Sequence, residues 1–377
     1  MSTLNQKLEN FFSGYHSSAT AARDGEPGAD VSFSYLFFSD VRKDVSDRDK
    51  YHFARELVEF ADQAGFESVC FPERHFYEFG SIYANNAIAA AYFAPLTKNV
   101  RLRSAAVTNT LHHPVEIVEN WAMVDILSGG RVELGIGSGW NKADFILSPE
   151  TYEDRAKIRD RRIPVIQRLW RGESVDFPGP GGEIFPTIVY PRPIQKEVAI
   201  WYFSISEPGF RYAGLQGYNV FGMLHGIDLH EFGKYVNSYR AARAEAGLDP
   251  QSGRVTLMMH TFVHPDMEWV QRVVCEPFKA YIRSSIIPQM KARDKQFDNG
   301  QIDQILDYAY ARFFKTGGIF GPLEECQKQI DVAVACGVNE IAFLQDFGMD
   351  YAAVKNALGY LQQLVDLNLK REKSFYE

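Results

Sequence analysis

The length, composition and charge of the chain exclude several classes of protein. Its 377 residues are 46% hydrophobic and 23% charged, an ordinary composition for a folded protein with a large core. The formal net charge of −8 argues against binding to nucleic acid, because phosphate backbones need a basic face. No apolar run approaches the roughly 20 residues that span a bilayer, and the N-terminus lacks the basic-then-apolar layout of a signal peptide. We therefore expect a cytoplasmic protein that contacts no membrane.

The four cysteines give no sign of a disulfide framework or a metal site. Cys70, Cys275, Cys326 and Cys336 lie far apart in the sequence, with no CxxC spacing. Such a pattern is typical of reduced, mostly buried thiols in the cytoplasm. The sequence therefore predicts free cysteines and no bound metal.

The first 30 residues differ in character from the rest of the chain. Apolar residues recur on one side of a short amphipathic helix over residues 1–13. Residues 14–30 are small and polar, as in a flexible linker. We expect this extension to precede a single domain over residues 31–377.

From residue 31 onward, apolar runs of strand length alternate with segments of helical periodicity. The runs predict strands at residues 31–38, 68–71, 100–108, 131–137, 199–204, 219–224, 255–263 and 339–345. Helices are predicted at about 48–65, 85–96, 114–128, 151–171, 207–217, 229–247, 267–285, 302–314, 322–336 and 350–371. Because the strands alternate with helices and number eight, the pattern favours a closed (β/α)8 TIM barrel over an open doubly wound sheet.

Two segments interrupt the alternation. Residues 173–198 contain FPGPGG and FPTIVYPRP without a helical period, which predicts a surface insertion after strand 4, built as a small hairpin. Residues 286–301 are polar and without pattern, which predicts an insertion after strand 7.

Function in such a barrel concentrates at the C-terminal ends of the strands. After the second predicted strand, Glu73, Arg74 and His75 follow one another. An imidazole at this place could act as a general base or donate to a developing oxyanion. The alternative is a histidine satisfied within a loop network. His112 and His113 also follow a strand, the third, and the alternative to a functional role is that they only shape the turn before Pro114.

Three elements after consecutive strands could together bind a phosphate. The fourth strand ends in Gly135-Ile136-Gly137-Ser138-Gly139-Trp140, where glycines permit close approach of a planar or phosphorylated ligand. Arg155, in the next helix, could pair with a phosphate or be a solvated surface charge. Ser204 and Ser206 precede another helix, where hydroxyl and N–H groups suit an anion, although a plain N-cap is the alternative.

The order of these motifs resembles the bacterial-luciferase-like, flavin-dependent monooxygenases. The resemblance rests on FADQAGFESVCFPERHFYEFGSIYANN, RSAAVT, HHPVEIVENWAMVDILSGGRVELGIGSGWNKADF and TGGIFGPLEECQKQI, in family order between about residues 31 and 345. Within the family, the chain looks most similar to the branch from natural-product gene clusters, of the mupirocin-pathway oxygenase type. HExxH, nucleophile-elbow, P-loop and CxxC motifs do not occur in the sequence.

The resemblance implies FMN as the cofactor and assigns roles to particular residues. The FMN phosphate would be held by Ser138, Arg155 and Ser206. The flavin ring would lie against the end of the third strand, where the family has a non-proline cis peptide, here between Ala105 and Ala106. Gly137 and Trp140 would flank the ring, and Asn141 would line the neighbouring loop together with Asp144, a candidate catalytic residue beside Arg74 and His75. The family's mobile active-site lid would correspond to residues 286–301, and their polar composition agrees.

Two positions depart from bacterial luciferase itself. Luciferase has two adjacent histidines where this chain has Arg74 and His75, and the luciferase base matches Arg74. An arginine cannot accept a proton at neutral pH, so the catalytic role passes to His75 or is absent. Luciferase also has a reactive cysteine where this chain has Gly137. Both differences argue against light emission from aldehydes.

The resemblance thus implies a two-component monooxygenase, which uses oxygen and reduced FMN from a separate flavin reductase to oxygenate an organic substrate. The substrate would be a natural-product intermediate, either a free small molecule or one bound to an acyl or peptidyl carrier protein. The enzyme would be a homodimer. A deazaflavin-dependent dehydrogenase of the same fold is one alternative, and a non-catalytic flavin-binding subunit is another. Oxygen consumption would exclude the first alternative, and turnover would exclude the second.

Overall fold

A computed structural model describes the chain at residues 31–38, 42–76, 80, 82–291 and 299–374. The predicted N-terminal helix and linker lie outside these residues. The described chain divides into two compact units. One unit comprises residues 46–203, and the other comprises residues 204–374 together with residues 31–45. We refer to them as the 46–203 unit and the 204–374 unit.

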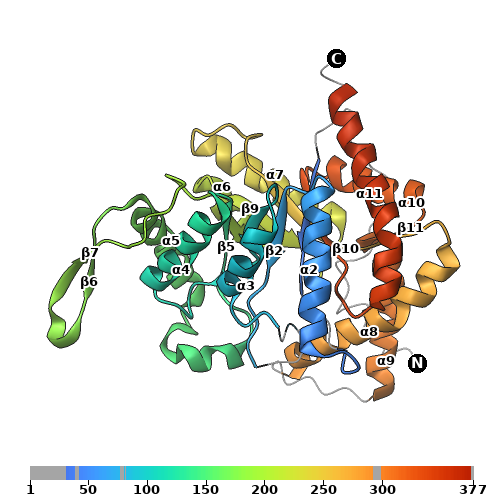
Figure 1. Ribbon diagram of the computed structural model, residues 1–377, viewed down its shortest axis with the longest axis horizontal. Coiled ribbons are helices and arrows are strands. Elements are labelled where there is room, and N and C mark those ends of the chain that lie inside the picture. Colours follow the sequence, from blue (N-terminus) through green and yellow to red (C-terminus); the bar gives the residue numbers. More distant parts are fainter. Residues whose placement is uncertain (1–30, 39–41, 77–79, 81, 292–298, 375–377) are drawn as a thin grey trace. The chain divides into compact units, whose positions relative to one another are not determined.

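The 46–203 unit contains a parallel sheet covered by helices (Figure 1). Its strands, in spatial order, are β2 (Ser68–Phe71), β3 (Arg101–Ser104), β5 (Val132–Gly137) and β8 (Ile200–Phe203), and β4 (Val107–Thr108) also pairs with β5. Its α-helices are α2 (Asp47–Gln63), α3 (Asn86–Phe93), α4 (Pro114–Ser128) and α5 (Arg155–Arg171). Short 3-10 helices cover Ala94–Leu96, Lys142–Leu147 and Pro149–Thr151. The predicted third strand is therefore divided into β3 and β4, and a cis peptide bond joins Ala105 to Ala106 between them.

The 204–374 unit contains the remaining parallel strands. Their spatial order is β9 (Asn219–Met223), β10 (Val255–Val263), β12 (Glu340–Leu344) and β1 (Ser32–Leu36), with β11 (Gly318–Gly321) paired to the end of β10. The helices are α6 (Glu207–Leu215), α7 (Leu229–Glu245), α8 (Met267–Lys291), α9 (Asn299–Arg312), a π-helix at Phe313–Gly317, α10 (Leu323–Ala335) and α11 (Tyr351–Ser374).

Local sequence explains where the helices begin and end. Ser46 caps α2, because its hydroxyl accepts a hydrogen bond from the N–H of Asp49. Pro114 occupies the first turn of α4, where a missing N–H costs nothing. Gly129 ends α4 in a left-handed conformation, with φ at 72°.

The interior of the 46–203 unit includes a buried ion pair. Arg103 on β3 is fully buried and its Nε lies 2.7 Å from Oε2 of Glu133 on β5. Ser68 Oγ donates to the same carboxylate oxygen at 2.9 Å. The Arg103 guanidinium lies 3.8 Å from the ring centre of Trp201, so its charge is paired on one side and covered by an aromatic ring on the other.

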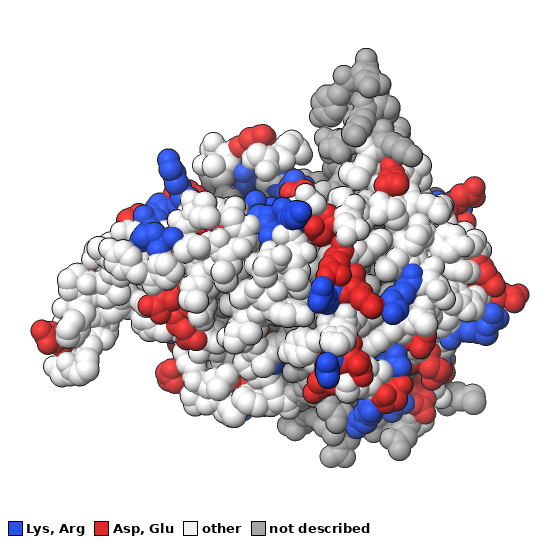
Figure 2. Space-filling view, viewed as in Figure 1, with Lys and Arg blue, Asp and Glu red and all other residues white. Residues whose placement is uncertain are grey.

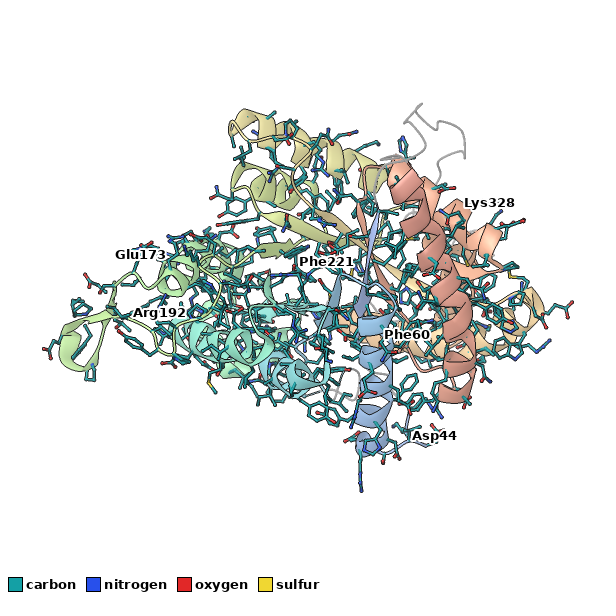
Figure 3. All side chains as sticks on the ribbon, turned by 45° about the horizontal axis from the view of Figure 1, so that its top comes forward. Asp44, Phe60, Glu173, Arg192, Phe221 and Lys328 are labelled. Carbon is teal, nitrogen blue, oxygen red and sulfur yellow. The ribbon has the colours of Figure 1, made fainter. Side chains whose placement is uncertain are left out.

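The predicted insertion after strand 4 is confirmed as a hairpin. β6 (Val175–Pro178) and β7 (Ile184–Thr187) pair antiparallel and extend beyond α4 and α5 (Figure 1). Their large side chains Ile184 and Phe185 are exposed. Arg192, near the hairpin base in Figure 3, donates to the carbonyl oxygens of Leu169 and Trp170 at 3.1 and 2.6 Å. The hairpin is thus fastened to the end of α5.

The insertion after strand 7 is also present, but it differs from the prediction in two ways. α8 continues past the expected break to Lys291, and α9 already begins at Asn299, so part of the predicted lid at 286–301 is helical. The strand β11 was not predicted. β10 is nine residues long, and β12 pairs with it only from Thr256 to His260, so the end of β10 is left for β11 to pair with.

All four cysteines lie within the described residues. The cysteines are free, with Cys70 and Cys326 buried and Cys275 and Cys336 partly so, as predicted. No helix of the described residues is long and apolar enough to cross a bilayer. On the face shown in Figure 2, Lys and Arg side chains are interspersed with Asp and Glu side chains, and few charges cover α3 and α4.

Candidate functional site

The candidate site is built from three segments that follow neighbouring strands of the 46–203 unit. Residues 72–76 follow β2, residues 109–113 follow β4 and residues 138–141 follow β5. Because these strands are parallel and adjacent, their C-terminal ends lie at the same edge of the sheet. Side chains distant in sequence meet there.

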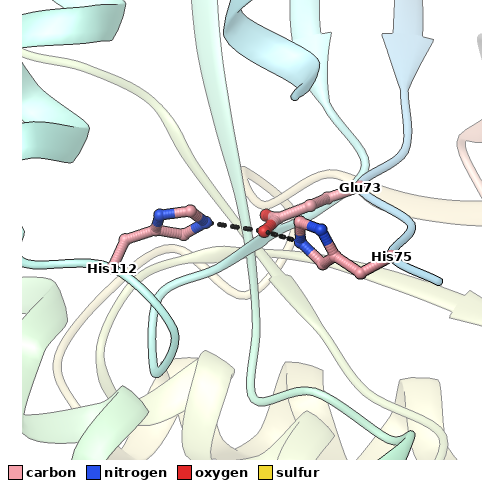
Figure 4. A group of neighbouring side chains, drawn as sticks. All are labelled: Glu73, His75 and His112. Carbon is pink, nitrogen blue, oxygen red and sulfur yellow. Dashed lines mark hydrogen bonds and ion pairs between the residues drawn. The ribbon is translucent and has the colours of Figure 1, made fainter. Parts of the chain in front are cut away.

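Glu73 lies at the centre of this site and joins two histidines (Figure 4). Its Oε1 is 2.8 Å from Nε2 of His75 and 2.6 Å from Nε2 of His112. Its Oε2 accepts a hydrogen bond from the backbone N–H of Thr108 at 2.9 Å. An ionised carboxylate only accepts hydrogen bonds, so each imidazole presents an N–H to it.

The hydrogen bonds within the cluster favour the charged forms of Glu73 and His112. Burial alone would raise the pKa of Glu73, but the hydrogen bonds from His112 and His75 hold that pKa below its ordinary value. Burial would likewise lower the pKa of His112, but the hydrogen bond to Glu73 and the charges of Glu73 and Glu116 raise it. The carboxylate form of Glu73 and the protonated form of His112 therefore stabilise each other.

The backbone that carries His112 is fixed from α5. Nη1 of Arg162 donates to the carbonyl oxygens of Asn109 and His112, at 2.6 and 2.9 Å. On the outer side, Nδ1 of His112 lies 3.5 Å from Oε1 of Glu116, which is half exposed. The neighbouring His113 has a different role, because its Nδ1 accepts from the N–H of Val115 and caps α4. His113 therefore shapes the turn into α4, whereas His112 contacts Glu73.

The residue after His75 has an unusual backbone. Phe76 has φ at 62°, in the left-handed region that a bulky side chain rarely adopts, and its side chain is 58% exposed. Its ring centre lies 5.7 Å from that of His75. Such local strain is frequent at functional sites, where the surrounding structure maintains it.

Asp144 adds a second acid to the site. It lies in the short 3-10 helix Lys142–Leu147 after β5, and its Oδ1 accepts a hydrogen bond from Nδ2 of Asn141 at 2.6 Å. Loss of solvent on burial raises the pKa of Asp144 to about 6, despite opposing effects of His75, Asn141 and Arg74. A carboxyl group that titrates near neutral pH is suited to transfer protons.

Arg74 and Trp140 form the more open side of the site. The Trp140 side chain is 45% exposed, and the guanidinium of Arg74 lies 5.8 Å from its ring centre. An arginine in this place supplies positive charge rather than a base. The exposed indole offers a flat apolar face for a ligand.

The structure places the predicted phosphate-binding residues in both units. Ser138 follows β5, and Arg155 begins α5, where its Nη1 donates to the carbonyl of Tyr152 at 2.8 Å. Ser204 and Ser206 belong to the 204–374 unit, and their hydroxyl oxygens lie 3.4 Å apart. The joint phosphate site of Ser138, Arg155 and Ser206 therefore remains a prediction.

Three local features lie where the resemblance implies the flavin nucleotide. Ser206 stands at the N-cap of α6, and its hydroxyl contacts Ser204 Oγ at 3.4 Å instead of capping the helix. A Cβ added to Gly209, in the first turn of α6, would lie 2.0 Å from Ser204 Oγ and 3.4 Å from Ser206 Oγ, so the backbone here is closely matched to these hydroxyls. The expected cis peptide between Ala105 and Ala106 is present, and Ala105 N–H donates to the carbonyl of Phe71 at the end of β2.

The sequence did not reveal that Glu73 contacts two histidines at the centre of the site, or that His112 is one of them. Glu73 was visible as a charged residue at a strand end, but nothing local indicates which imidazole it contacts. Its contact with His112 joins residues 39 positions apart and follows from the adjacency of β2, β3 and β4. The sequence feature that could have indicated this contact is that His112, like Glu73, follows a predicted strand, and the C-terminal ends of parallel strands lie at one edge of the sheet.

Taken with its helices, this strand order defines a (β/α)8 TIM barrel with a carboxylate–imidazole cluster at the C-terminal ends of its strands, as the sequence predicted. That is the usual place for catalysis in a barrel enzyme. Residues 31–340 match the family described as luciferase-like monooxygenase. The chain belongs to this family.

Known proteins similar to this chain include oxygenases and a dehydrogenase. The oxygenase component of flavin-dependent trigonelline monooxygenase from Acinetobacter baylyi is 24% identical over 80% of this chain and 85% of its own length. F420-dependent glucose-6-phosphate dehydrogenase from Amycolatopsis mediterranei is 30% identical over 43% of this chain and 51% of its own length.

Solved structures share the fold. Monooxygenase RslO1 from Streptomyces bottropensis superposes with a TM-score of 0.74 and 21% identity, over 90% of this chain and all of its own. The oxygenating constituent of 3,6-diketocamphane monooxygenase from Pseudomonas putida, in complex with FMN, gives a TM-score of 0.73 and 18% identity, over 90% and 98% of the two chains.

Proposed function

We propose that this chain is the oxygenase component of a two-component, FMN-dependent monooxygenase. The observation that carries the proposal is the cluster of Glu73, His75 and His112, which adjoins the strand ends where the family places its flavin. A barrel of this family with ionisable groups at that edge is suited to proton transfer beside a redox cofactor.

The residues divide into those that would hold FMN and those that would handle protons. Ser138, Arg155 and Ser206 would hold the phosphate, with Ser204 positioning Ser206 through their 3.4 Å contact. Gly137, Ala105, Ala106 and Trp140 would lie against the flavin ring. Reduced FMN, when bound, supplies the electrons that activate oxygen.

His75 would donate a proton during oxygen transfer, and Glu73 would position its ring. The carboxylate receives the Nε2–H of His75 and so sets the orientation of the imidazole. Asp144, held by Asn141, would exchange protons with the same region at near-neutral pH. Arg74 would supply positive charge beside Trp140.

The partners of the enzyme follow from the same proposal. A separate flavin reductase would supply reduced FMN, as the name of the trigonelline relative, an oxygenase component, suggests. The substrate would be an organic small molecule, either free or on an acyl or peptidyl carrier protein, in a natural-product pathway of the mupirocin type. A single barrel domain over residues 31–377 in the cytoplasm would carry the activity.

A homodimer is proposed from an exposed apolar face. The adjacent helices α3 and α4 expose Ile88, Tyr92, Met123, Ile126 and Leu127. The surface above them carries few charges in Figure 2. Exposed apolar surface of this kind is commonly covered by a partner, and a second copy of the chain would do so.

The test is the oxidation of reduced FMN by oxygen in the presence and absence of the protein. We expect the protein to slow the loss of reduced FMN relative to free solution, and a substrate to divert electrons from hydrogen peroxide into product. His75→Ala should release more peroxide without losing FMN, whereas His52→Ala, on the exposed face of α2, serves as the matched control. Oxidation at the free-solution rate with every substrate tried would overturn the proposal.

A second candidate function is a deazaflavin-dependent dehydrogenase. The similarity to F420-dependent glucose-6-phosphate dehydrogenase, at 30% identity over part of the chain, favours it. In that case the protein would bind F420, a deazaflavin, in preference to FMN and would not consume oxygen. Binding titrations with both cofactors, followed by oxygen electrode measurements, separate the two functions. FMN binding without any turnover would instead indicate a non-catalytic flavin-binding subunit.

A further inference from the structure

The cluster at the end of β2 presents three donor atoms to one small region. The donor atoms of Glu73, His75 and His112 all lie within 4.8 Å of one another (Figure 4). We propose that these side chains form a binding site for a divalent transition-metal ion, best matched by Zn²⁺. The binding site is argued without the flavin, and an ion bound here would take the place of the Nε2 proton that the proposed function assigns to His75.

The donor set determines the kind of ion. Two imidazole nitrogens and one carboxylate oxygen are typical ligands of Zn²⁺, and three protein ligands leave a fourth position for water or another ligand. Ca²⁺ and Mg²⁺ prefer sites made of oxygen atoms, so they fit poorly. The same donors also suit Fe²⁺, and Cu²⁺ would bind more tightly than Zn²⁺ by the general order of stabilities.

The observed distances are close to those a metal requires. Ligand atoms about 2.0–2.1 Å from a zinc ion lie roughly 3 Å or slightly more from one another. The carboxylate oxygen of Glu73 is 2.8 and 2.6 Å from the two imidazole nitrogens. Small side-chain rotations would open these contacts by a few tenths of an ångström. The ion would then replace the protons that the cluster now shares.

Outer contacts already orient the ligands as metal sites require. The second oxygen of Glu73 accepts from the N–H of Thr108, so the first is directed at the histidines. Nδ1 of His112 faces the carboxylate of Glu116 at 3.5 Å, an arrangement that favours a free lone pair on Nε2 when a metal binds. The loop carrying His112 is fixed by Arg162.

The site is both enclosed and reachable. The Glu73 side chain is 2% exposed, while those of His75 and His112 are 13% and 21% exposed. A buried carboxylate attracts a cation strongly, and the partly open imidazoles give it a path from solvent. The carboxylate of Asp144 is close enough to interact with the charges of Glu73, His75 and Arg74.

The test uses the full-length, tag-free protein after treatment with a chelator. Calorimetric titration with ZnCl₂ should give one ion per chain. Titration with CoCl₂ should give visible absorption bands characteristic of a nitrogen- and oxygen-ligated ion. Glu73→Gln and His112→Ala should each weaken Zn²⁺ binding by roughly 100-fold or more, and Glu116→Gln by about 10- to 100-fold.

His113→Ala is the matched control, because His113 is adjacent and exposed but caps α4 instead of facing Glu73. Circular dichroism checks that each variant is folded, and the conservative Glu73→Gln change keeps the shape of the side chain. Absence of stoichiometric binding would overturn the proposal, as would equal losses in His112→Ala and His113→Ala. Because no step uses flavin, these outcomes are independent of the monooxygenase activity.

Discussion

Replacing Asp144 with asparagine is expected to stabilise the protein at neutral pH. Burial raises the pKa of this carboxyl to about 6 from an ordinary value of 3.8. At about 1.4 kcal/mol for each pKa unit, the ionised side chain costs the folded state up to about 3 kcal/mol. Asp144 is not completely enclosed, so we expect Asp144→Asn to gain about 1–3 kcal/mol at pH 8. Asparagine can still accept the hydrogen bond from Asn141.

The stabilisation by Asp144→Asn should increase with pH. The folded state binds the Asp144 proton more tightly than the unfolded state does, so stability falls as pH rises between the two pKa values. The cost is nearly absent at about pH 4, roughly half developed at about pH 5 and complete above about pH 7. Asp144→Asn should therefore stabilise the protein about half as much at pH 5 as at pH 8.

Urea unfolding of the wild type and Asp144→Asn at several pH values measures this difference. Asp176→Asn, on the exposed strand β6, is the control and should change stability by less than about 0.5 kcal/mol. An equal effect of Asp144→Asn at pH 5 and pH 8 would refute the reasoning, since it could not arise from the titration of the carboxyl. If Asp144 also exchanges protons in catalysis, the variant should lose a step near pH 6 in its rate profile.

The other predictions concern the cofactor, the reaction, the core and the assembly. Arg155→Ala should weaken FMN binding by about 10- to 100-fold, as for a lost charge-assisted hydrogen bond, whereas Arg161→Ala, on the exposed side of α5, should not; fluorescence titration decides, and an unchanged affinity would remove Arg155 from the phosphate site. His75→Ala should keep FMN binding and lower coupled turnover by about 100-fold or more, and full activity in this variant would assign the proton to another group. Glu133→Ala should cost about 3–5 kcal/mol in chemical unfolding, because Arg103 would remain buried without its carboxylate; a loss below about 1 kcal/mol would mean that Arg103 is otherwise compensated. Met123→Glu and Leu127→Glu should convert a dimer to a monomer in analytical ultracentrifugation, whereas a charge on the opposite side of α4 should not; a dimer unaffected by both changes would place the interface elsewhere.

Much of the barrel could be predicted because each strand is a short apolar run between helices of clear period. The divided third strand illustrates the limit, since Ala105 and Ala106 look like ordinary strand residues in the sequence. β11 was missed because its four residues form a strand only where the long β10 leaves an unpaired edge. Whether β11 forms therefore depends on the length of β10.

The site was predicted in part, for a similar reason. His75 was predicted because it follows a strand and carries an ionisable group, and Asp144 was predicted from the family resemblance. The role of Glu73 depends on a contact with His112 across neighbouring strands, which periodicity cannot reveal. The position of Ser206 relative to Arg155 rests on the family resemblance alone.

The shared oxygen of Glu73 has a consequence for how this site can evolve. Because Oε1 of Glu73 accepts hydrogen bonds from both His75 and His112, replacing either histidine changes the hydrogen bonding of the other. The effects of the two substitutions should therefore not add in a double-mutant cycle. A substitution at Glu73, His75 or His112 therefore changes which residues are tolerated at the other two positions, so we expect the three to change together in evolution.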